Sequence, residues 1–530
     1  MTDEASIPAA GDYHMTTDEF RALGHELIDF IADYRDNISD YPVLSQVASG
    51  DIAAQLRPTP PEHGEDLLGL VDDLRSIIAP GLTHWQSPNF FAYFPANASL
   101  PSVLGELVSA GFGVQGMLWA TSPAATEVET VMMDWLVDLC GLPRGFHSSN
   151  DGGGVMLDSA SSAVLTSMVA ARHRAVGHRA APELRAYTST QAHSSVLKGM
   201  RVAGFADEQL RSIDVDEDFA MRADVLAEAM AQDVADGLVP FFIVGTVGTT
   251  SSTAIDPIAD IAALGAEYNA WVHVDAAFAG SAAVAPELRP LVNSGLDTVD
   301  SYSFNPHKWL LTNFDAAAYW VADQPSLTSA MAIVPEYLKN AATESGHVID
   351  YRDWMVPLGR RFRALKLWMV IRWYGAEGLR AFVRDHVAIA QELSGWVDAH
   401  PSFVRLAPTP FSLVCFAHVD GDDRTRGIVD AINAAGAHYV THTTLNERYT
   451  LRVAIGSVTT DRTHVETLWN DILALAERHA GSDPSSRGVR PVVTRGQTLG
   501  STLSHRSGRG DCAKYARRRV FSRDCYSPAR

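Results

Sequence analysis

Apolar runs alternate with a helical pattern in the middle of the chain, and this alternation constrains the fold more than any other feature. The stretch PFFIVGTVGTTS, residues 240–251, predicts a buried strand that ends in a turn of small residues. Residues 256–268 predict a helix, and WVHVDAAF, residues 271–278, predicts a second buried strand. Because strands that alternate with helices form mostly parallel sheets, we expect an α/β architecture for this region.

The regions on either side of this α/β pattern differ from it. Near the N-terminus, Thr16 and Glu19 predict a capping box at the start of an amphipathic helix, and a second helix is expected at residues 67–78. Nothing in these helices predicts a core of their own, so the arm needs another surface, which a partner subunit usually supplies. After a predicted amphipathic helix at residues 363–374, the strands SLVCFAHV and TLRVAIG indicate a smaller α+β unit.

Four parts of the chain are therefore expected. They are an N-terminal helical dimerisation arm at residues 1–99, a large domain at 100–365, a small C-terminal domain at 366–482 and a basic tail at 483–530. The tail carries 11 Lys/Arg and 3 Asp/Glu and is rich in Ser and Gly, which predicts disorder. Since the whole chain has a net charge of −21, the part before the tail is strongly acidic, which argues against a nucleic-acid-binding enzyme.

The sequence also bears on location and metal binding. It has no apolar run of about 18 residues, the length that indicates a membrane span, and no secretion signal at its N-terminus. Four cysteines are too few for a disulfide framework in 530 residues, which favours a reducing compartment. No His/Cys cluster has the spacing of metal ligands. We expect a cytoplasmic protein with no membrane association and no metal site.

Lys308 has the most unusual setting of the five lysines in the chain. It lies in SFNPHKWLL between a histidine and an apolar run, and Pro306 restricts the preceding Asn305 to an extended conformation. A desolvated lysine has a lowered pKa and can form a Schiff base with a carbonyl group. The local sequence supports equally an ordinary lysine whose ammonium reaches solvent from the end of a strand.

Asp275 favours the chemical interpretation of Lys308. It follows the apolar stretch around Val272 and Val274, at the carboxyl end of a predicted strand, where ligands bind in open α/β sheets. A buried carboxylate needs a partner, and the protonated ring nitrogen of pyridoxal phosphate is a suitable one. On this stretch alone, an Asp that caps the next turn is an equally good interpretation.

A phosphate group needs its own binding site, and residues 152–172 offer one. Ala160 and Ser161 lie just before an apolar helical pattern, where backbone N–H groups of a helix N-terminus bind anions. Thr250, in the turn after a buried strand, adds a hydroxyl. His193, in QAHSS, can stack on a pyridine ring, although a lone histidine in a loop is more often simply solvated.

Taken together, these motifs resemble those of the pyridoxal-phosphate-dependent group II decarboxylases, in particular the aromatic-L-amino-acid decarboxylase branch. The resemblance covers nearly the whole chain before the tail. Its carriers are THWQSPNFFAYFP, SPAATEVETVMMDWL, GGGVMLDSASSA, QAHSS, HVDAAFAG, SFNPHKWLL and DYRDWMVPLGRRFRALKLW. The resemblance implies fold type I, the aspartate aminotransferase-like α/β fold, and a homodimer with shared active sites in which the N-terminal helices wrap onto the partner.

The resemblance also assigns roles to individual residues. Lys308 forms the Schiff base with pyridoxal phosphate, Asp275 pairs with its ring nitrogen, and His193 stacks on the ring. Tyr337 matches a tyrosine in a mobile loop that protonates the substrate carbon after carbon dioxide leaves. The remaining positions that match cofactor contacts are Ala160, Ser161, Thr250, Asn305 and His307. The positions that match the substrate pocket are Trp85, Tyr93, Phe94, Pro95, Ala96, Met117, His193, Phe278 and Gly359.

Some of these positions depart from the family pattern. Ala96 and Phe278 each lack a hydroxyl that animal members carry, and Met117 stands where an aromatic residue is common. The pocket is therefore expected to be less polar and more adaptable. Gly359 matches a position where plant relatives with indole substrates carry Gly, which favours an open pocket. The other predicted wall, residues 115–117, comes from the second subunit.

The leading prediction is decarboxylation of an aromatic L-amino acid (Trp, Dopa, Tyr or Phe) to the arylalkylamine and carbon dioxide. An aromatic aldehyde synthase has the same fold, but such enzymes typically lack the loop tyrosine or the stacking histidine, and both Tyr337 and His193 are present. A decarboxylase of a non-aromatic amino acid is a further alternative, and an aminotransferase fits the motifs less well. A cofactor-free binding protein would not need every one of these positions filled.

Overall fold

The computed structural model describes residues 14–65, 67–333, 336–338 and 340–477. The described residues all belong to one compact unit. The predicted tail lies outside the described residues. Among the described residues, no helix is both long enough and apolar enough to cross a membrane.

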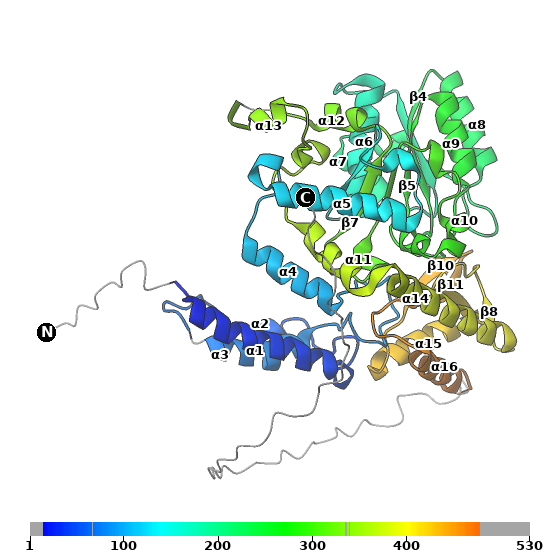
Figure 1. Ribbon diagram of the computed structural model, residues 1–530. Helices are drawn as coiled ribbons and strands as arrows, with labels where there is room; N and C mark the ends of the chain where they lie inside the picture. The colour runs from blue at the N-terminus through cyan, green and yellow to red at the C-terminus, as the bar shows by residue number, and fades with distance from the viewer. Residues whose placement is uncertain (1–13, 66, 334–335, 339, 478–530) are drawn as a thin grey trace, which may run out of the picture. The chain divides into compact units, whose positions relative to one another are not determined.

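A seven-stranded sheet forms the centre of the unit (Figure 1). Its strands are β1 Gly153–Leu157, β2 Leu184–Ser189, β3 Leu210–Ile213, β4 Val239–Thr246, β5 Trp271–Asp275, β6 Ser301–Phe304 and β7 Ala317–Val321, in the order β1-β7-β6-β5-β4-β2-β3. Five neighbouring strands of this order, β3, β2, β4, β5 and β6, pair in parallel, whereas β7 is antiparallel to both β6 and β1. The expectation of a mostly parallel sheet, built on β4 and β5, is confirmed.

Helices cover both faces of this sheet. The helices in this part of the chain are α4 Leu100–Phe112, α5 Pro123–Cys140, α6 Ala160–Val176, α7 Ser195–Val202, α8 Ala223–Ala235, α9 Ile258–Tyr268, α10 Arg289–Val292, α11 Pro306–Trp309, α12 Gln324–Met331 and α13 Ala341–Glu344. Neighbouring strand residues pack into two separate cores, as the two-residue period of a strand requires. On β4, Phe242 and Val244 pack with α6, α7 and α12, whereas Ile243 packs with α5, α8 and α9. Burial on both faces explains why these strands are continuous apolar runs.

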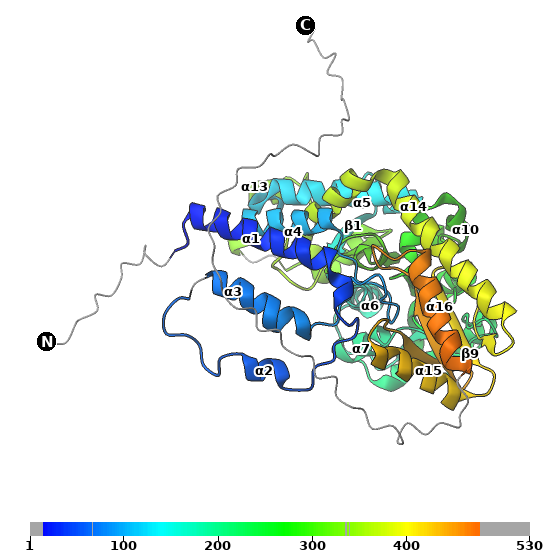
Figure 2. The ribbon, with the colours of Figure 1, turned by 90° about the horizontal axis from the view of Figure 1, so that it is seen from below.

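A second sheet lies near the C-terminus of the described chain. Its antiparallel strands are β8 Phe403–Arg405, β9 Leu413–His418, β10 Thr441–Leu445 and β11 Arg448–Ala454, in the order β10-β11-β9-β8. Helices α15 Asp422–Ala435 and α16 Arg462–Glu477 pack against each other beside this sheet (Figure 2). The helix predicted around residues 363–374 is confirmed: α14 spans Arg363–Ala399, but its helical conformation is broken at Gly375, whose φ is +63°, and a second helical segment follows. Glycine adopts this conformation without a steric penalty, so the helical pattern resumes beyond it.

The N-terminal arm consists of α1 Thr17–Asp36, α2 Asp51–Gln55, α3 Leu67–Asp73 and the π-helical turn Leu74–Ile78. Thr16 and Glu19 form the predicted capping box. No residue of α1 is buried, and Phe20 on α1 is 62% exposed, as is 63% of Phe112 on α4. The expectation that these helices have no core of their own is confirmed, whereas the domain boundaries stay predictions.

Candidate active site

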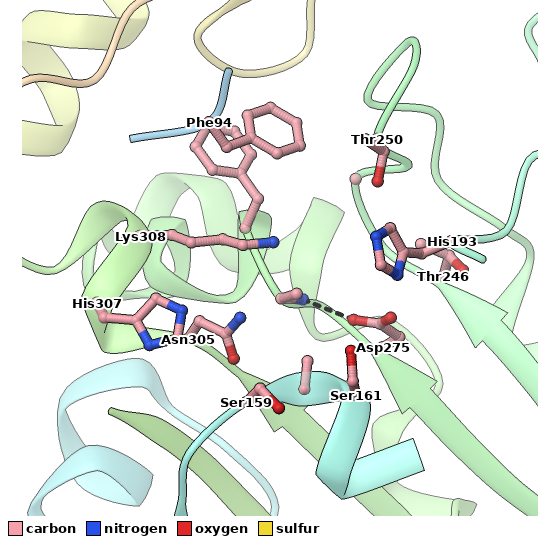
Figure 3. A pocket seen from close by; sticks show the side chains of 14 residues that line it. Phe94, Ser159, Ser161, His193, Thr246, Thr250, Asp275, Asn305, His307 and Lys308 are labelled. Atoms are coloured by element: carbon pink, nitrogen blue, oxygen red, sulfur yellow. Dashed lines mark hydrogen bonds between the residues drawn. The ribbon is translucent and has the colours of Figure 1, made fainter. Parts of the chain in front are cut away.

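A cavity of about 220 Å³ opens where β4, β5 and β6 end and α6 begins (Figure 3). Its lining is polar at one end and apolar at the other. The lining residues are Phe94, Ser159, Ala160, Ser161, His193, Thr246, Gly248, Thr250, Asp275, Ala277, Phe278, Asn305, His307 and Lys308. This is the place where open α/β sheets bind ligands, because the carboxyl ends of parallel strands and helix N-termini meet there.

Lys308 lies in the short helix α11, which follows β6 directly. Its side chain is partly buried, and Figure 3 shows it on one side of the cavity, with Asp275 and His193 on the other. Burial lowers the pKa of the Lys308 ammonium, and the negative charge of Asp275 opposes that shift. A lysine with a lowered pKa is neutral more often, and only the neutral amine attacks a carbonyl carbon.

Asp275 ends β5 and is only 4% exposed. Its Oδ1 accepts a hydrogen bond from the N–H of Ala277 at 2.9 Å, and its carboxylate lines the cavity. Since a buried carboxylate is costly without a partner, this geometry suits a cationic group of a bound molecule.

The N-terminus of α6 forms the opposite, anion-binding part of the cavity. The hydroxyl of Ser159 caps the helix by accepting a hydrogen bond from the N–H of Ser162 at 3.3 Å. The first residues of the helix, Ala160 and Ser161, line the cavity, so their orphan N–H groups and the helix dipole face it. The 17 residues of α6 are enough for a full helix dipole. Such a site binds a phosphate group.

Two histidines flank these groups. His193 is exposed in the single chain, and its Nδ1 accepts a hydrogen bond from the N–H of Ser195 at 3.2 Å. Partial burial lowers the pKa of His193, which the negative charge of Asp275 opposes. His307 accepts a hydrogen bond at Nδ1 from the N–H of Ala316 at 2.9 Å, so its Nε2 carries the proton in the neutral ring. Burial, aided by the positive charge of Lys308, lowers the pKa of His307 to about 3.

The apolar end of the cavity is a stack of aromatic rings. The rings of Phe94 and Phe278 are parallel within 5°, with centroids 3.8 Å apart, and Phe278 stacks in turn on Trp309 at 4.7 Å. The ammonium of Lys308 lies 5.7 Å from the centroid of Phe94. An aromatic wall next to the lysine suits a flat, apolar group of a bound molecule.

These groups fit pyridoxal phosphate. Lys308 can bond its aldehyde, Asp275 can hold a proton on its ring nitrogen, and the N-terminus of α6 can hold its phosphate. Two further polar atoms support the fit. Asn305 and Thr246 both line the cavity, and Oδ1 of Asn305 and Oγ1 of Thr246 are buried and have no hydrogen-bond partner within the described chain. Buried polar groups of this kind generally have a partner, which a bound molecule can provide.

The structure brings together all of the predicted cofactor contacts and three of the predicted substrate contacts, namely Phe94, His193 and Phe278. The other predicted substrate residues do not line the cavity: Trp85, Tyr93, Pro95, Ala96, Met117 and Gly359. The rings of Trp85 and Tyr93 stack on each other at 5.7 Å and remain partly exposed. The segment next to Met117 instead contacts Arg360, whose carbonyl accepts a hydrogen bond from the N–H of Gly116. The roles of these residues stay predictions.

The predicted role of Tyr337 stays a prediction. Its backbone lies in the 3₁₀ turn Glu336–Leu338, and its side chain lies outside the described residues. For metals, the described ranges contain no group of three or more His, Cys, Asp or Glu side chains that could hold an ion.

The sequence interpretation missed four lining residues: Ser159, Thr246, Gly248 and Ala277. Ser159 carried a detectable signal, since Ser is a preferred N-cap and an apolar helical pattern follows it. Gly248 has a φ of +83°, and a Cβ atom there would lie 2.6 Å from the Cβ of Ala279. This close approach depends on the folded chain, so no local pattern predicted it.

The similarity to known proteins extends over most of the chain. Residues 50–419 match the family model of the pyridoxal-dependent decarboxylase conserved domain. The chain is 46% identical to a phenylacetaldehyde synthase from Arabidopsis thaliana, over 86% of this chain and 96% of that protein. It is 41% identical to tyrosine decarboxylase 2 from Narcissus pseudonarcissus, over 90% of this chain and 97% of that protein. The crystal structure of Oryza sativa TDC with PLP and tryptamine matches with a TM-score of 0.85 at 39% identity, covering 87% of this chain and 98% of that one.

Fold and site thus define a pyridoxal-phosphate-dependent enzyme of fold type I. The chain belongs to the pyridoxal-dependent decarboxylase family, in the branch of aromatic amino acid decarboxylases and aldehyde synthases. The predicted family, fold class and cofactor are confirmed.

Proposed function

We propose that this enzyme decarboxylates an aromatic L-amino acid, releasing carbon dioxide and the arylalkylamine. The observation that carries the proposal is the cavity itself, in which Lys308 and Asp275 lie on either side of a space bounded by the N-terminus of α6 (Figure 3). Bound pyridoxal phosphate supplies the electron sink for the electrons released when the bond between Cα and the carboxylate breaks.

The residues of this chain prepare the site for that reaction. The amine of Lys308, when neutral, would be the group that holds the cofactor covalently through its aldehyde. The carboxylate of Asp275 keeps a proton on the ring nitrogen, which is required for an effective electron sink. The N–H groups at the start of α6, with Asn305 and His307 beside them in the cavity lining, would hold the phosphate.

His193 and Tyr337 act on the substrate in this proposal. His193 would lie against the cofactor ring and face the substrate; its Nδ1 is already occupied by the N–H of Ser195, which leaves Nε2 as the proton-bearing atom of the neutral ring. Tyr337 gives a proton to Cα after carbon dioxide has left, which completes the amine. The sequence supports this role for Tyr337.

The substrate side chain is proposed to lie against the stacked rings of Phe94 and Phe278. That wall offers no hydrogen-bonding group, which supports an aromatic substrate over a small acidic or diamino one. Relatives point the same way, since a tyrosine decarboxylase and a tryptophan decarboxylase are each 41% identical to this chain. Ala96, Met117 and Gly359 make the rest of the pocket open and apolar in the proposal.

An aromatic aldehyde synthase is the second candidate, because the phenylacetaldehyde synthases from Arabidopsis thaliana and from Rosa are 46% and 43% identical to this chain. In that reaction the substrate is decarboxylated and also oxidised by dioxygen, which yields the aldehyde, ammonia and hydrogen peroxide. The presence of both Tyr337 and His193 favours the amine.

The enzyme is further proposed to act as a cytoplasmic homodimer with shared active sites. The arm and the neighbouring helix α4 support this, because Phe20 on α1 and Leu107 and Phe112 on α4 are largely exposed in the single chain. A second copy would cover such surfaces and contribute residues 115–117 to the partner's pocket. Neither a nucleic acid nor a membrane partner is proposed.

Covalent labelling and product analysis test this function. Pyridoxal phosphate followed by borohydride should label Lys308 in the wild type and label nothing in Lys308→Ala. Lys198→Ala, which removes an exposed lysine of α7, is the matched control and should keep the label. Incubation with Trp, Dopa, Tyr and Phe should give amine and carbon dioxide from at least one of them. Label on Lys198 or Lys366, or aldehyde and peroxide as the main products, would contradict the proposal.

A further inference from the structure

The segment that follows Phe94 runs along the loop that carries Lys308. Each of three residues in it makes at least one hydrogen bond to that loop. Asn97 bonds to the carbonyls of His307 and Lys308, Ser99 Oγ donates to the carbonyl of Leu311 at 2.5 Å, and Ser102 Oγ accepts from the N–H of Asn313 at 3.1 Å. These contacts join parts of the chain that lie about 210 residues apart in sequence.

Asn97 makes the contact closest to the reactive lysine. Its N–H donates to the carbonyl of His307 at 2.9 Å, and its side-chain Nδ2 donates to the carbonyl of Lys308 itself at 2.7 Å. Asn97 is 1% exposed, so water cannot replace these bonds. Its Oδ1 is buried and has no hydrogen-bond partner among the described residues. An unpaired buried acceptor lowers the stability of the folded chain, so the side-chain amide of Asn97 is not explained by stability alone.

The peptide carbonyl that Asn97 holds belongs to a very short element. Helix α11 has only four residues, so intrahelical hydrogen bonds alone fix the backbone of Lys308 poorly. The N–H of Lys308 bonds to the carbonyl of Asn305 at 2.9 Å, and the amide of Asn97 fixes its carbonyl. With both peptide groups fixed, the direction in which the lysine side chain leaves the backbone is fixed as well.

The same segment carries the aromatic wall of the cavity. Phe94 lies three residues before Asn97, and its ring stacks on Phe278 and lies 5.7 Å from the ammonium of Lys308. A shift of Asn97 relative to Lys308 would therefore change the distance between the lysine and the surface on which the substrate ring rests.

We propose that Asn97 is a positioning residue: through its bond to the carbonyl of Lys308 it sets the place of the lysine amine relative to the cofactor aldehyde and to the Phe94 wall. This inference rests on the proposed function, in which Lys308 holds the cofactor. Asn97 itself is not among the residues that line the cavity, so it acts through Lys308 in this proposal.

The test compares two cofactor forms on Asn97→Ala, Asn97→Asp and the control Ser99→Ala. Pyridoxal phosphate must condense with the lysine, whereas pyridoxamine phosphate carries an amine in place of the aldehyde and binds only through its ring and phosphate. The rate of covalent attachment of pyridoxal phosphate to apoprotein is followed by visible absorbance, and the affinity for pyridoxamine phosphate by protein fluorescence. Asn97→Asp keeps the side-chain volume but removes the donor to Lys308.

A positioning role predicts a split between these measurements. Both Asn97 variants should attach pyridoxal phosphate at least about 10-fold more slowly and lose a similar factor in kcat with little change in KM, because small misplacements of reacting groups have effects of this order. Their affinity for pyridoxamine phosphate should equal that of the wild type. Ser99→Ala loses a hydrogen bond to the same loop but not to Lys308, so its attachment rate should stay within about 2-fold of the wild type.

Other outcomes overturn the inference. Equal losses for both cofactor forms, or an equally slow attachment in Ser99→Ala, would show that Asn97 only stabilises the loop. Wild-type attachment in Asn97→Asp would show that the bond to Lys308 is unimportant. A wild-type protein that attaches no cofactor at Lys308 would refute the proposed function instead, and this result is distinguishable because it appears before any Asn97 variant is made.

Discussion

Acidification should destabilise the cofactor-free enzyme, because three buried histidines near the site resist protonation. Burial lowers the pKa of His273 and of His386 from 6.5 to about 4, and burial together with the charge of Lys308 lowers that of His307 to about 3. The unfolded chain takes up a proton on each ring near pH 6.5, whereas the folded protein does so only near pH 4 or below. Stability is therefore fully present above pH 6.5 and is lost as the pH falls below it.

The size of the effect follows from these values. At pH 5 each histidine is about 1.5 pH units below its unfolded pKa, which corresponds to about 2 kcal/mol of lost stability per group at 1.36 kcal/mol per unit. Asp256 acts in the opposite direction, since burial raises its pKa from 3.8 to about 6 and the folded protein gains a proton first. Protonation of Asp256 raises the free energy of unfolding by about 1 kcal/mol at pH 5. The three histidines and Asp256 together should therefore lower the free energy of unfolding by about 5 kcal/mol between pH 7 and pH 5.

The assay measures urea unfolding of apoprotein at pH 7 and pH 5, at one fixed protein concentration, for the wild type and for His386→Asn. His386 accepts a hydrogen bond at Nδ1 from Nε1 of Trp309 at 3.1 Å, and the Oδ1 of Asn can accept the same bond without titrating. The variant should be less stable at pH 7, yet its loss between the two pH values should be about 2 kcal/mol smaller than in the wild type. His25→Asn, on the exposed face of α1, is the control and should keep the wild-type pH difference. An unchanged pH difference in His386→Asn would refute the reasoning.

Three further substitutions test two residues of the proposed reaction and one buried ion pair. Tyr337→Phe removes the proposed proton donor, so product analysis should find aldehyde, ammonia and peroxide in place of amine; amine at the wild-type rate would exclude Tyr337 as the acid. Asp275→Ala should still attach the cofactor to lysine but turn over at least about 100-fold more slowly, and wild-type turnover would exclude the pairing with the ring nitrogen. Glu129→Ala leaves the buried guanidinium of Arg360 without its carboxylate, so urea unfolding should show a free energy of unfolding about 3–5 kcal/mol lower than in the wild type. The double variant Glu129→Met/Arg360→Met removes both charges and should recover most of this stability.

The sequence predicted the elements and residues whose environment is local. The strands β4 and β5 were visible as apolar runs because both faces of the sheet are covered by helices. Lys308 and Asp275 were visible because charged residues next to apolar runs are rare without a reason. The structure brings both into one cavity, as the prediction required.

Other features were not predictable because they depend on parts of the chain that are distant in sequence. Strand β1 begins in a run of glycines, which have a low strand propensity, yet a Cβ atom on Gly154 would lie 2.5 Å from the side chain of Trp320. Two neighbours that are distant in sequence make glycine favourable there: Trp320 on the paired strand β7 and Met133 on α5. The unpaired oxygens of Thr246 and Asn305 are likewise visible only in three dimensions.

The lysine loop shows why positioning residues escape a reading of motifs. Asn97, from the predicted arm, holds the carbonyl of Lys308, and His386, from the predicted small domain, holds the indole of the adjacent Trp309. Arg452, on β11, donates hydrogen bonds to the carbonyls of Ala92 and Thr250, and so joins the segment of the aromatic wall to a turn that lines the cavity. The predicted domain boundaries therefore separate residues that contact one another around the cavity. A substitution at any of these contacts can alter the rate while every motif that touches the cofactor stays intact, so relatives with identical motifs need not share a rate or a product.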